Sequence, residues 1–225
     1  MENKLTIALP KGRLGSEVLS FLGRTGLPVE GVSPDSRTLM FDFPEQGICY
    51  LICKPTDVPT FVEYGAADLG VVGKDTIEEE GKDVFELADL GFGYCRFAVA
   101  VPRELRDRVS VDGRFPLTDF SHHRVATKFV RVADRFFKSR GMQMEIIKLN
   151  GNIELAARIG LSDMIVDIVS TGTTLRENGL VEVEEIFPAT ARLIANRVSY
   201  RLKNERITGV VRRAKELLKE EKSHE

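Results

Sequence analysis

The sequence predicts an α/β fold in two lobes, each built on a mixed, largely parallel sheet. Short apolar runs of strand length alternate with segments whose apolar residues recur at helical spacing, a pattern typical of sheets covered by helices. Two such clusters of strands and helices meet near Gly91 to Gly93. We therefore expect a first lobe from residues 1–92 plus 180–225, a second from 93–179, and a ligand in a central cleft between them.

The elements of the first lobe follow from the apolar runs and the residues that bound them. An apolar run ends at Pro10, and apolar residues then recur at helical spacing as far as Gly23. Two β-type runs flank the segment 44–47, which predicts a hairpin. The expected strands are 5–9, 38–43, 48–53 and 68–72, and the expected helices are 14–22, 57–62 and a long charged helix from Lys203.

The second lobe repeats this alternation. A long β run is stopped by Pro102, and the polar segment after it predicts a short helix and a loop. An amphipathic stripe ends at Gly141, which suits a helix C-terminus. The expected strands are 94–101, 124–127, 145–149 and 164–169, and the expected helices are 129–140 and 153–159. The last residues, 219–225 with His224, are charged and expected to fray.

Composition narrows the class of protein. Of 225 residues, 43% are hydrophobic and 29% charged, as in ordinary globular proteins. A net charge of −2 gives no broad basic surface, so we expect no nucleic-acid partner. No apolar run approaches the roughly 20 residues of a membrane span, and the opening segment lacks a signal-peptide layout. We expect a cytoplasmic protein without a membrane partner.

Cysteine and histidine usage predicts no structural metal and no disulfide framework. Cys49 and Cys53 lie at strand spacing on one face, which favours buried small hydrophobic side chains, and Cys95 lies in another apolar run. The three histidines lack the spacing of metal ligands. Neither residue type therefore indicates a metal centre.

The stretch from 154 to 175 is the most informative. Its apolar run, Met164 to Val169, opens directly into a hydroxyl-rich turn made of Ser170, Thr171, Gly172, Thr173 and Thr174. Glycine allows a sharp turn and close approach to an anion, and amides at a helix start favour negative charge. The turn therefore predicts a phosphate cradle, although threonine also serves as an ordinary helix cap.

Asp167, just before this turn, extends the prediction to a sugar phosphate. A carboxylate there suits ribose hydroxyls, directly or through a magnesium ion. The pattern G-x-x-x-x-G-K-[ST] is absent, which excludes a P-loop NTPase. Asp163 and Glu154 flank the same stretch and could be taken for an acid–base pair, but the sequence favours an ordinary solvated helix position for Glu154. The chain shows no Ser/His/Asp arrangement in its sequence.

Further candidates follow the strands of the first lobe. Lys11 and Arg13 surround a glycine after the first strand, and Lys54 ends the hairpin strand, positions that face the ligand crevice of an α/β sheet. Two cations beside a glycine suit a polyphosphate, and a solvated surface turn is the alternative. Glycine-rich turns that include Gly73, followed by Asp75, fit either a packed base or tight strand–helix packing. Arg37 alone carries little information.

Taken in order, these segments resemble the ATP phosphoribosyltransferase family, the first enzyme of histidine biosynthesis. The resemblance covers nearly the whole chain. Departures are Ala157 and Val130, where the family has proline, and Lys54, where arginine is usual. Lysine keeps the charge but loses the bidentate grip. The segments that carry the resemblance are LTIALPKGRL, GAADLGVVGKD, HRVATKF, ELAARIGLSDMIVDIVSTGTTLRENGL and ARLIANR.

The resemblance implies a fold like type II periplasmic binding proteins and a transfer of phosphoribose from phosphoribosyl pyrophosphate to N1 of ATP, with Mg²⁺ on the pyrophosphate, near Asp167. It implies site residues in three groups. The phosphoribosyl pyrophosphate group is Asp167, Ser170, Thr171, Gly172, Thr173 and Thr174, with Asp163 and Glu154 nearby. The leaving-group cations are Arg13, Arg37 and Lys11. The ATP group is Lys11, Lys54, Gly73 and Asp75.

The resemblance also implies partners. The chain resembles the short form of the family, which works with a regulatory subunit similar to histidyl-tRNA synthetase in a hetero-octamer that contains homodimers of the catalytic chain. Two alternatives stay open at this stage. One is a two-lobed protein that binds a small anion without chemistry, and the other is a phosphoribosyltransferase for a different base.

Overall fold

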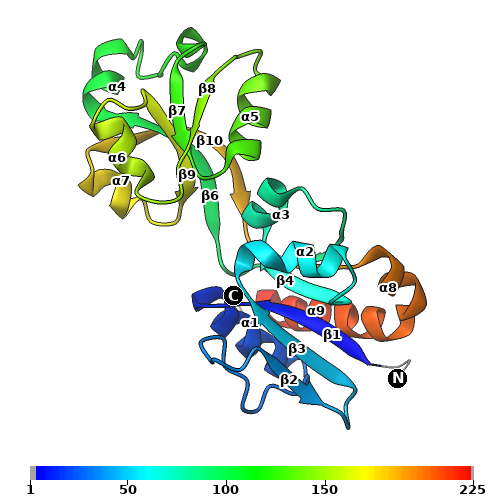
Figure 1. Ribbon diagram of the computed structural model, residues 1–225. Coiled ribbons are helices and arrows are strands. Elements are labelled where there is room, and N and C mark those ends of the chain that lie inside the picture. The colour runs from blue at the N-terminus through cyan, green and yellow to red at the C-terminus, as the bar shows by residue number, and fades with distance from the viewer. Residues whose placement is uncertain (1–3, 224–225) are drawn as a thin grey trace. The chain divides into compact units, whose positions relative to one another are not determined.

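The computed structural model describes residues 4–223 and contains two compact units (Figure 1). The first combines 1–93 with 190–225, and the second is 94–189. The second crossing lies later than position 179, where the sequence placed it. Strand β10 (Leu180–Ala189) pairs along its length with β6 (Cys95–Pro102) and so belongs to the second unit. His224 lies outside the described residues.

The first unit is built on a six-stranded sheet of order β2-β3-β1-β4-β11-β5. The central strands β3, β1 and β4 are parallel, β2 forms the predicted antiparallel hairpin with β3, and β11 runs antiparallel to both of its neighbours. The sheet is therefore mixed, with β2 and β11 opposed to the rest. The strands are β1 (Leu5–Pro10), β2 (Met40–Phe43), β3 (Ile48–Cys53), β4 (Leu69–Gly73), β5 (Phe85–Asp89) and β11 (Ala191–Ala195).

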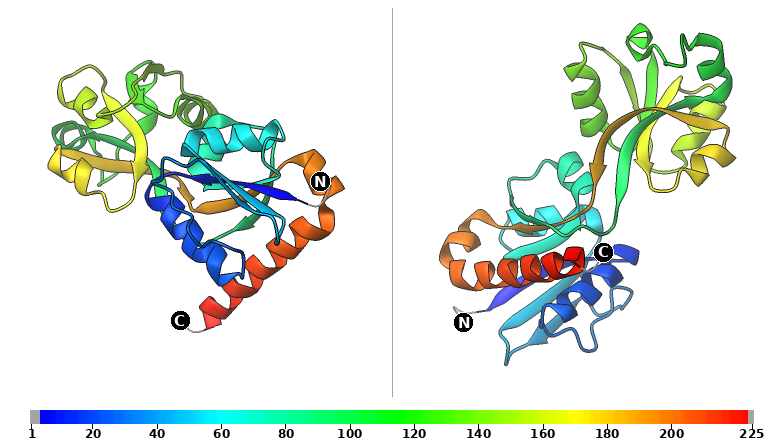
Figure 2. Two further views of the ribbon diagram at one scale, coloured as in Figure 1. Left: turned by 60° about the horizontal axis from the view of Figure 1, so that its bottom comes forward. Right: turned by 180° about the vertical axis from the view of Figure 1, so that it is seen from behind.

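Alternation along β1 sends apolar side chains to both faces of this sheet. Leu5, Ile7 and Leu9 join one buried cluster, whereas Ala8 joins the other. Helices α1 (Arg13–Arg24) and α9 (Asn204–Ser223) pack on the first face, and they lie side by side there (Figure 2). The opposite face is covered by α2 (Val58–Glu63) and α3 (Lys74–Glu80). The short elements η1 (Pro55–Asp57) and α8 (Arg197–Leu202) complete the unit.

The second unit has a five-stranded sheet of order β10-β6-β9-β7-β8, in which β6 alone opposes the common direction. Its remaining strands are β7 (Arg124–Thr127), β8 (Glu145–Lys148) and β9 (Met164–Val169). Its helices are α4 (Arg103–Val109), η2 (Leu117–Phe120), α5 (Val130–Ser139), α6 (Ile153–Arg158) and α7 (Thr173–Glu177). The strands β7 and β9 begin and end where the sequence predicts.

The two faces of this second sheet carry side chains of different size. Phe97 and Val99 of β6 pack with α5, whereas Ala98 and Ala100 face α6 and α7. Small alanines leave room for these two short helices to approach the sheet. As a result, α6 and α7 lie close to the end of β9, where the candidate phosphate turn begins.

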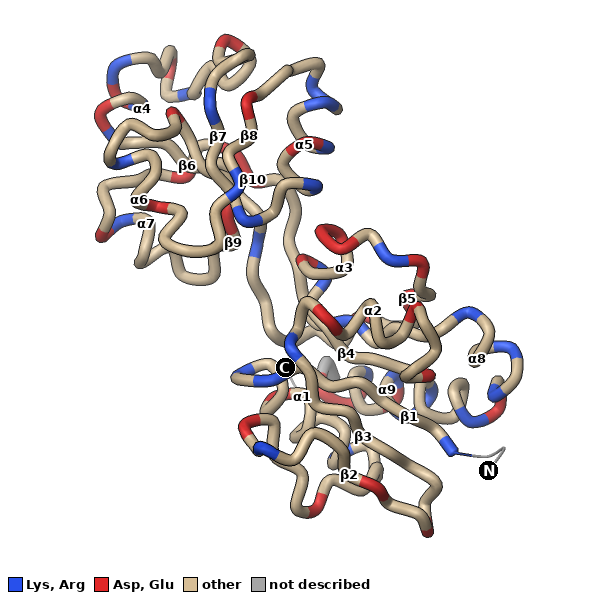
Figure 3. The backbone as a smooth tube through the Cα atoms, viewed as in Figure 1, with Lys and Arg blue, Asp and Glu red and all other residues tan. Residues whose placement is uncertain are grey.

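Several elements differ from the sequence-based expectation. The helices α3 and α8 and the strands β5 and β10 were not expected, and α9 continues to Ser223 without the fraying expected from position 219. Lysine and arginine are interspersed with acidic residues on both units (Figure 3). Within residues 4–223, none of the helices combines the length and apolar character that a membrane crossing requires. Cys49 and Cys53 are buried, as expected.

Candidate functional site

The turn after β9 has the backbone that the sequence predicts. Gly172 adopts φ 72° and ψ 7°, in the left-handed region, and directly precedes α7. A side chain at this position would strain the backbone, so glycine is required by conformation. Residues 170–174 line a cavity of about 170 Å³ together with Asp167 and Glu154. The structure therefore brings together the turn and two of the three acidic candidates.

Asp167 owes its position to the alternation of β9. Ile165, Asp167 and Val169 point to the same face of the sheet, and Ile165 and Val169 pack into the cluster that includes α6. Asp167 pairs with the small residue Ala98 on β6. The carboxylate is thus held at the start of the turn, beside the helix that carries Glu154.

Burial dominates the electrostatics of Asp167. Loss of hydration, assisted by the negative charge of Glu154, raises the pKa of its carboxyl from the ordinary 3.8 to about 6. The N–H of Ile168, which donates to Oδ1 at 2.8 Å, and the positive charge of Lys128 oppose this rise. Asp167 is therefore a carboxylate that titrates close to neutral pH, next to a hydroxyl-lined cavity.

Asp163 is not brought to this cavity. It precedes β9 and lies four positions before Asp167, about 13 Å away at 3.3 Å per residue. Its Oδ2 accepts from the N–H of Arg124 at 3.0 Å and lies 3.4 Å from Nδ1 of His123. These contacts tie β7 to the start of β9, so the position of Asp163 indicates a structural role at the far end of the strand.

The cations of the first unit gather at the carboxyl edge of its sheet. Pro10 and Cys53 are register partners, and the N–H of Lys11 donates to the carbonyl of Cys53 at 2.8 Å. Lys11 and Lys54 therefore follow neighbouring strands, and both are exposed. Such an edge is where α/β sheets bind anionic ligands.

The two arginines of the first unit are exposed. Arg13 begins α1 with a side chain that is 79% exposed, and its Nε lies 3.6 Å from Glu17. Arg37 lies in the exposed loop before β2. Neither is held by buried contacts, so both are free to turn toward an anion.

The glycine-rich segment around β4 serves mainly in packing. A Cβ at Gly70 would lie 2.8 Å from the side chains of Val58 and Val62 on α2. A Cβ at Gly73 would lie 1.9 Å from Oδ1 of Asp75, whose carboxylate folds back over the start of α3. Close strand–helix packing thus explains both glycines, and Gly73 brings Asp75 to the carboxyl edge of β4.

Two residues near the candidate turn were missed by the sequence reasoning. Lys128 follows β7, the strand beside β9, and its charge acts on Asp167. The rule that identified Lys54, a cation directly after a parallel strand, applies to Lys128 as well. Arg176 donates hydrogen bonds to two residues of the turn. Its helical spacing from Gly172 was the available signal.

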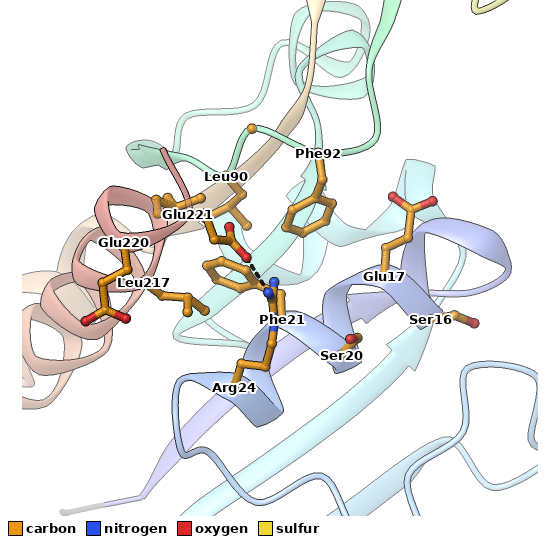
Figure 4. A pocket seen from close by; sticks show the side chains of 12 residues that line it. Ser16, Glu17, Ser20, Phe21, Arg24, Leu90, Phe92, Leu217, Glu220 and Glu221 are labelled. Atoms are coloured by element: carbon orange, nitrogen blue, oxygen red, sulfur yellow. Dashed lines mark hydrogen bonds and ion pairs between the residues drawn. The ribbon is translucent and has the colours of Figure 1, made fainter. Parts of the chain in front are cut away.

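A larger cavity of about 1050 Å³ lies in the first unit, between α1, α9 and residues 90–92 (Figure 4). Phe21 and Phe92 contribute rings to it, and Arg24 and Glu221 form an ion pair at its side. Its further acidic residues, Glu17 and Glu220, disfavour a polyphosphate. None of the predicted site residues lines this cavity.

The side chains of the described residues do not by themselves form a metal-binding cluster. Among the residues that the structure describes, no group of three or more histidine, cysteine, aspartate or glutamate side chains is placed to hold a metal ion. A divalent cation at Asp167 would therefore need most of its ligands from substrate oxygens and water, as is common for magnesium.

The fold and the turn define a class of protein: two α/β units, one of which carries an aspartate followed by a hydroxyl-rich turn that lines a cavity. A substrate-binding protein of an amino acid ABC transporter shares this fold, with a TM-score of 0.57 and 13% identity over 97% of this chain and 94% of that chain. At that identity the likeness concerns the fold alone.

The chain belongs to the ATP phosphoribosyltransferase family. The family model described as "HisG: ATP phosphoribosyltransferase" matches residues 54–216. An ATP phosphoribosyltransferase of Moorella thermoacetica is 64% identical over 209 residues, which cover 93% of this chain and 91% of the relative. The solved ATP phosphoribosyl transferase (HisG:HisZ) complex from Thermotoga maritima has a TM-score of 0.78 and 33% identity, with 96% and 99% of the two chains covered.

Membership of this family makes the chain an enzyme of the first step of histidine biosynthesis, a transferase acting on ATP. This excludes the two alternatives that the sequence left open, a binding protein without chemistry and a transferase for another base.

Proposed function

We propose that the chain joins N1 of the ATP adenine to C1 of the ribose in phosphoribosyl pyrophosphate. The N1 lone pair forms the new C–N bond while the C1–oxygen bond to pyrophosphate breaks, with inversion at C1. Adenine N1 already carries a free lone pair, so no strong base is needed. Positioning and charge stabilisation then supply most of the catalysis.

The observation that carries this proposal is the turn after β9 with Asp167 at its start. Thr171, Gly172, Thr173 and Thr174, with Ser170, hold the 5′-phosphate through main-chain amides and hydroxyls. Asp167 accepts hydrogen bonds from the ribose hydroxyls. Glu154, which lines the same cavity, supports this role by its position. Asp163, at the opposite end of β9, does not take part.

We propose Mg²⁺ as the metal ion of the reaction. The carboxylates of Asp167 and Glu154 beside a hydroxyl-lined cavity fit an ion that keeps several water or substrate ligands. Bound to the pyrophosphate, the ion would neutralise charge on the leaving group. Asp167 and Glu154 are the residues placed to face it.

The cations of the first unit are assigned to the leaving group and the nucleotide. Lys11, Arg13 and Arg37 stabilise the charge that builds on the departing pyrophosphate. Lys54 adds positive charge at the same sheet edge, next to Lys11. Gly73 and Asp75 lie on the nucleotide side. The exposure of both arginines supports a role in gripping a mobile polyanion.

We propose a regulatory subunit resembling histidyl-tRNA synthetase as the partner, assembled as a hetero-octamer around homodimers of this chain in the cytoplasm. The similar structure from Thermotoga maritima is a HisG:HisZ complex, which supports a second kind of subunit. Histidine is expected to inhibit weakly without that partner and strongly with it. Potent inhibition of the isolated chain would contradict the arrangement.

Formation of the adduct tests the reaction. The protein is mixed with ATP, phosphoribosyl pyrophosphate and Mg²⁺, with and without the regulatory subunit, and the ultraviolet absorbance and mass of the product are followed. A phosphoribosyl adduct of ATP together with one equivalent of pyrophosphate is expected. Binding of the donor without any adduct, even with the subunit present, would contradict the proposal.

Replacement of Arg37 tests the leaving-group role. Arg37→Ala is expected to lower kcat at least about tenfold while the KM values change by less than about threefold, because the lost interaction forms in the transition state. Arg201→Ala, an exposed arginine on α8, is the matched control. An unchanged kcat in Arg37→Ala would remove that residue from the role.

A further inference from the structure

The guanidinium of Arg176 bridges two parts of the candidate phosphate turn. Its Nη1 donates to the carbonyl oxygen of Thr171 at 3.1 Å, and its Nη2 donates to Oγ1 of Thr173 at 3.0 Å. Arg176 lies on α7, one helical turn after Gly172, and its own N–H donates to the carbonyl of Gly172 at 3.1 Å. One planar group therefore spans the turn from residue 171 to residue 173.

The first of these hydrogen bonds sets the direction of an amide. The carbonyl of Thr171 and the N–H of Gly172 belong to one trans peptide, so they point in opposite directions. Holding the carbonyl toward the guanidinium turns the N–H of Gly172 away from it. That amide is then presented on the side of the turn opposite Arg176.

Gly172 makes room for this arrangement. A Cβ at this position would lie 3.2 Å from Nη1 of Arg176, tighter than an ordinary contact. Glycine therefore serves two purposes here, since it permits the positive φ and lets the guanidinium lie against the backbone. The hydrogen bond from Nη2 of Arg176 fixes the hydroxyl of Thr173. That hydroxyl also accepts from the hydroxyl of Thr171 at 3.1 Å, so the two threonine side chains are held together.

A second guanidinium contacts the turn one residue earlier. Nη1 of Arg96 lies 3.4 Å from the carbonyl oxygen of Ser170, and its Nε and Nη2 are held by Glu182 at 2.9 and 2.7 Å. Glu182 thereby fixes Arg96 in place, and this hydrogen bond raises the pKa of the guanidinium. The contact with Ser170 is long, so Arg176 provides the principal brace.

We propose that Arg176 is a positioning residue that holds the turn in its phosphate-binding shape before the substrate arrives. The inference rests on the proposed role of the turn in binding the 5′-phosphate. Preorganised amides bind without the cost of ordering the loop, which lowers Kd. Lysine cannot replace arginine here, because a single Nζ does not offer two donors in a fixed planar fork.

Binding of ribose 5-phosphate provides the test. This probe carries the 5′-phosphate but no leaving group, and calorimetry measures its Kd for wild type, Arg176→Ala, Arg176→Lys and the control Arg158→Ala. Arg158 is an exposed arginine at the end of α6 in the same unit. Thermal unfolding checks that each variant is folded. If Arg176→Ala does not fold, Arg176→Lys alone is compared with wild type.

If Arg176 positions the turn, both Arg176 variants should raise Kd about tenfold, which corresponds to the free energy of one or two hydrogen bonds. Arg158→Ala should match wild type. In turnover, KM for phosphoribosyl pyrophosphate should rise while KM for ATP and kcat stay within about twofold. Because Arg176→Lys keeps the charge, the salt dependence of Kd should be that of wild type.

Three outcomes would overturn the brace. Arg176→Lys equal to wild type would show that charge alone acts, and Arg176→Ala equal to wild type would show no role. An equal loss in KM for ATP and in kcat would indicate a general structural defect. Failure of wild type itself to bind ribose 5-phosphate is distinguishable, because it would refute the phosphate assignment of the turn along with the brace.

Discussion

At the scale of single residues, Asp167 shows how the fold adjusts the chemistry of a side chain. Its place on β9 buries the carboxyl beside Glu154, and the loss of hydration raises its pKa to about 6. A group whose pKa is raised on folding stabilises the fold below its unfolded pKa and loses that contribution as pH rises through the folded value. Asp167 is therefore ionised at pH 7 at a cost in stability.

Replacement of Asp167 with asparagine should separate stability from binding. Asp167→Asn removes the buried charge, so the free energy of unfolding at pH 7 is expected to rise by up to about 3 kcal/mol, with no gain near pH 3.8. Denaturant unfolding at both pH values checks this. A variant that is less stable than wild type at pH 7 would show that the carboxylate is stabilised by its surroundings.

The same carboxylate predicts a pH dependence of substrate binding. The affinity for phosphoribosyl pyrophosphate should fall as pH drops through about 6, because Asp167 then binds a proton. Asp167→Asn should bind weakly at every pH and lose this step. Calorimetric titration of both proteins from pH 5 to pH 8 checks the prediction, and an identical pH profile in the variant would refute it.

Replacement of Gly172 tests whether the conformation of the turn is needed for binding, with Gly179 as the matched control. Gly172→Ala should weaken binding of phosphoribosyl pyrophosphate at least about tenfold, because the new Cβ strains a positive φ and presses on Arg176. Gly179→Ala is the control: its φ is +70°, and its Cβ would meet nothing within 4 Å. An equal loss of affinity in both variants would mean that backbone strain alone matters. Wild-type affinity in Gly172→Ala would mean that the turn holds no phosphate.

At the scale of elements, the sequence predicts best where short apolar runs end in glycine or proline. The strands β7 and β9 match the predicted bounds, and the hairpin of β2 and β3 is confirmed. The prediction fails where the local pattern is broken. The strand β10 has register shifts between Glu182 and Glu184 and between Glu185 and Phe187, which interrupt its period of two.

The candidate site shows the same limit. The turn and Asp167 are visible in one continuous segment, so the sequence finds them. Arg176 and Lys128 act through geometry that the sequence does not display, a side chain folded back on its own turn and a neighbouring strand. Asp163 is the opposite case: it is near in sequence, but the extended strand carries it to the other end of β9.

Packing of α1 on its sheet provides an element-scale prediction. A Cβ at Gly15 would lie 2.0 Å from the carbonyl oxygen of Pro10 and 2.7 Å from Cβ of Pro34. Gly15→Ala should therefore lower the free energy of unfolding by about 1–3 kcal/mol and displace the turn that carries Lys11. Chemical denaturation measures the change.

Gly209 supplies the control for that experiment. It lies in α9, and a Cβ there would meet nothing within 4 Å. Gly209→Ala should raise the free energy of unfolding by about 0.5–1 kcal/mol, since alanine is the better helix former. An unchanged or raised free energy of unfolding in Gly15→Ala would show that α1 is not packed as closely as described.

At the scale of the whole molecule, the buried residues form separate clusters in the two units. The clusters around Leu9 and Ala8 belong to the first unit, and those around Phe97 and Ala98 to the second. The second unit is also one continuous segment of chain, 94–189. Each unit therefore has the core that an independently folding domain requires.

A fragment of residues 94–189 is expected to fold alone. It should unfold cooperatively and bind ribose 5-phosphate, because the turn, Asp167 and Arg176 all lie within it. It should not form the adduct, because Lys11, Arg13 and Arg37 lie outside it. Circular dichroism, calorimetry and the adduct assay check these points. A disordered fragment would contradict the independence of this unit.

The central claim is that main-chain amides of the turn after Val169 hold the 5′-phosphate. A crystal structure of the protein with phosphoribosyl pyrophosphate bound tests it most directly. The account predicts the 5′-phosphate within hydrogen-bond distance of the amides of residues 171–174 and the ribose hydroxyls at Asp167. A donor anchored elsewhere, with this turn left open, would contradict it.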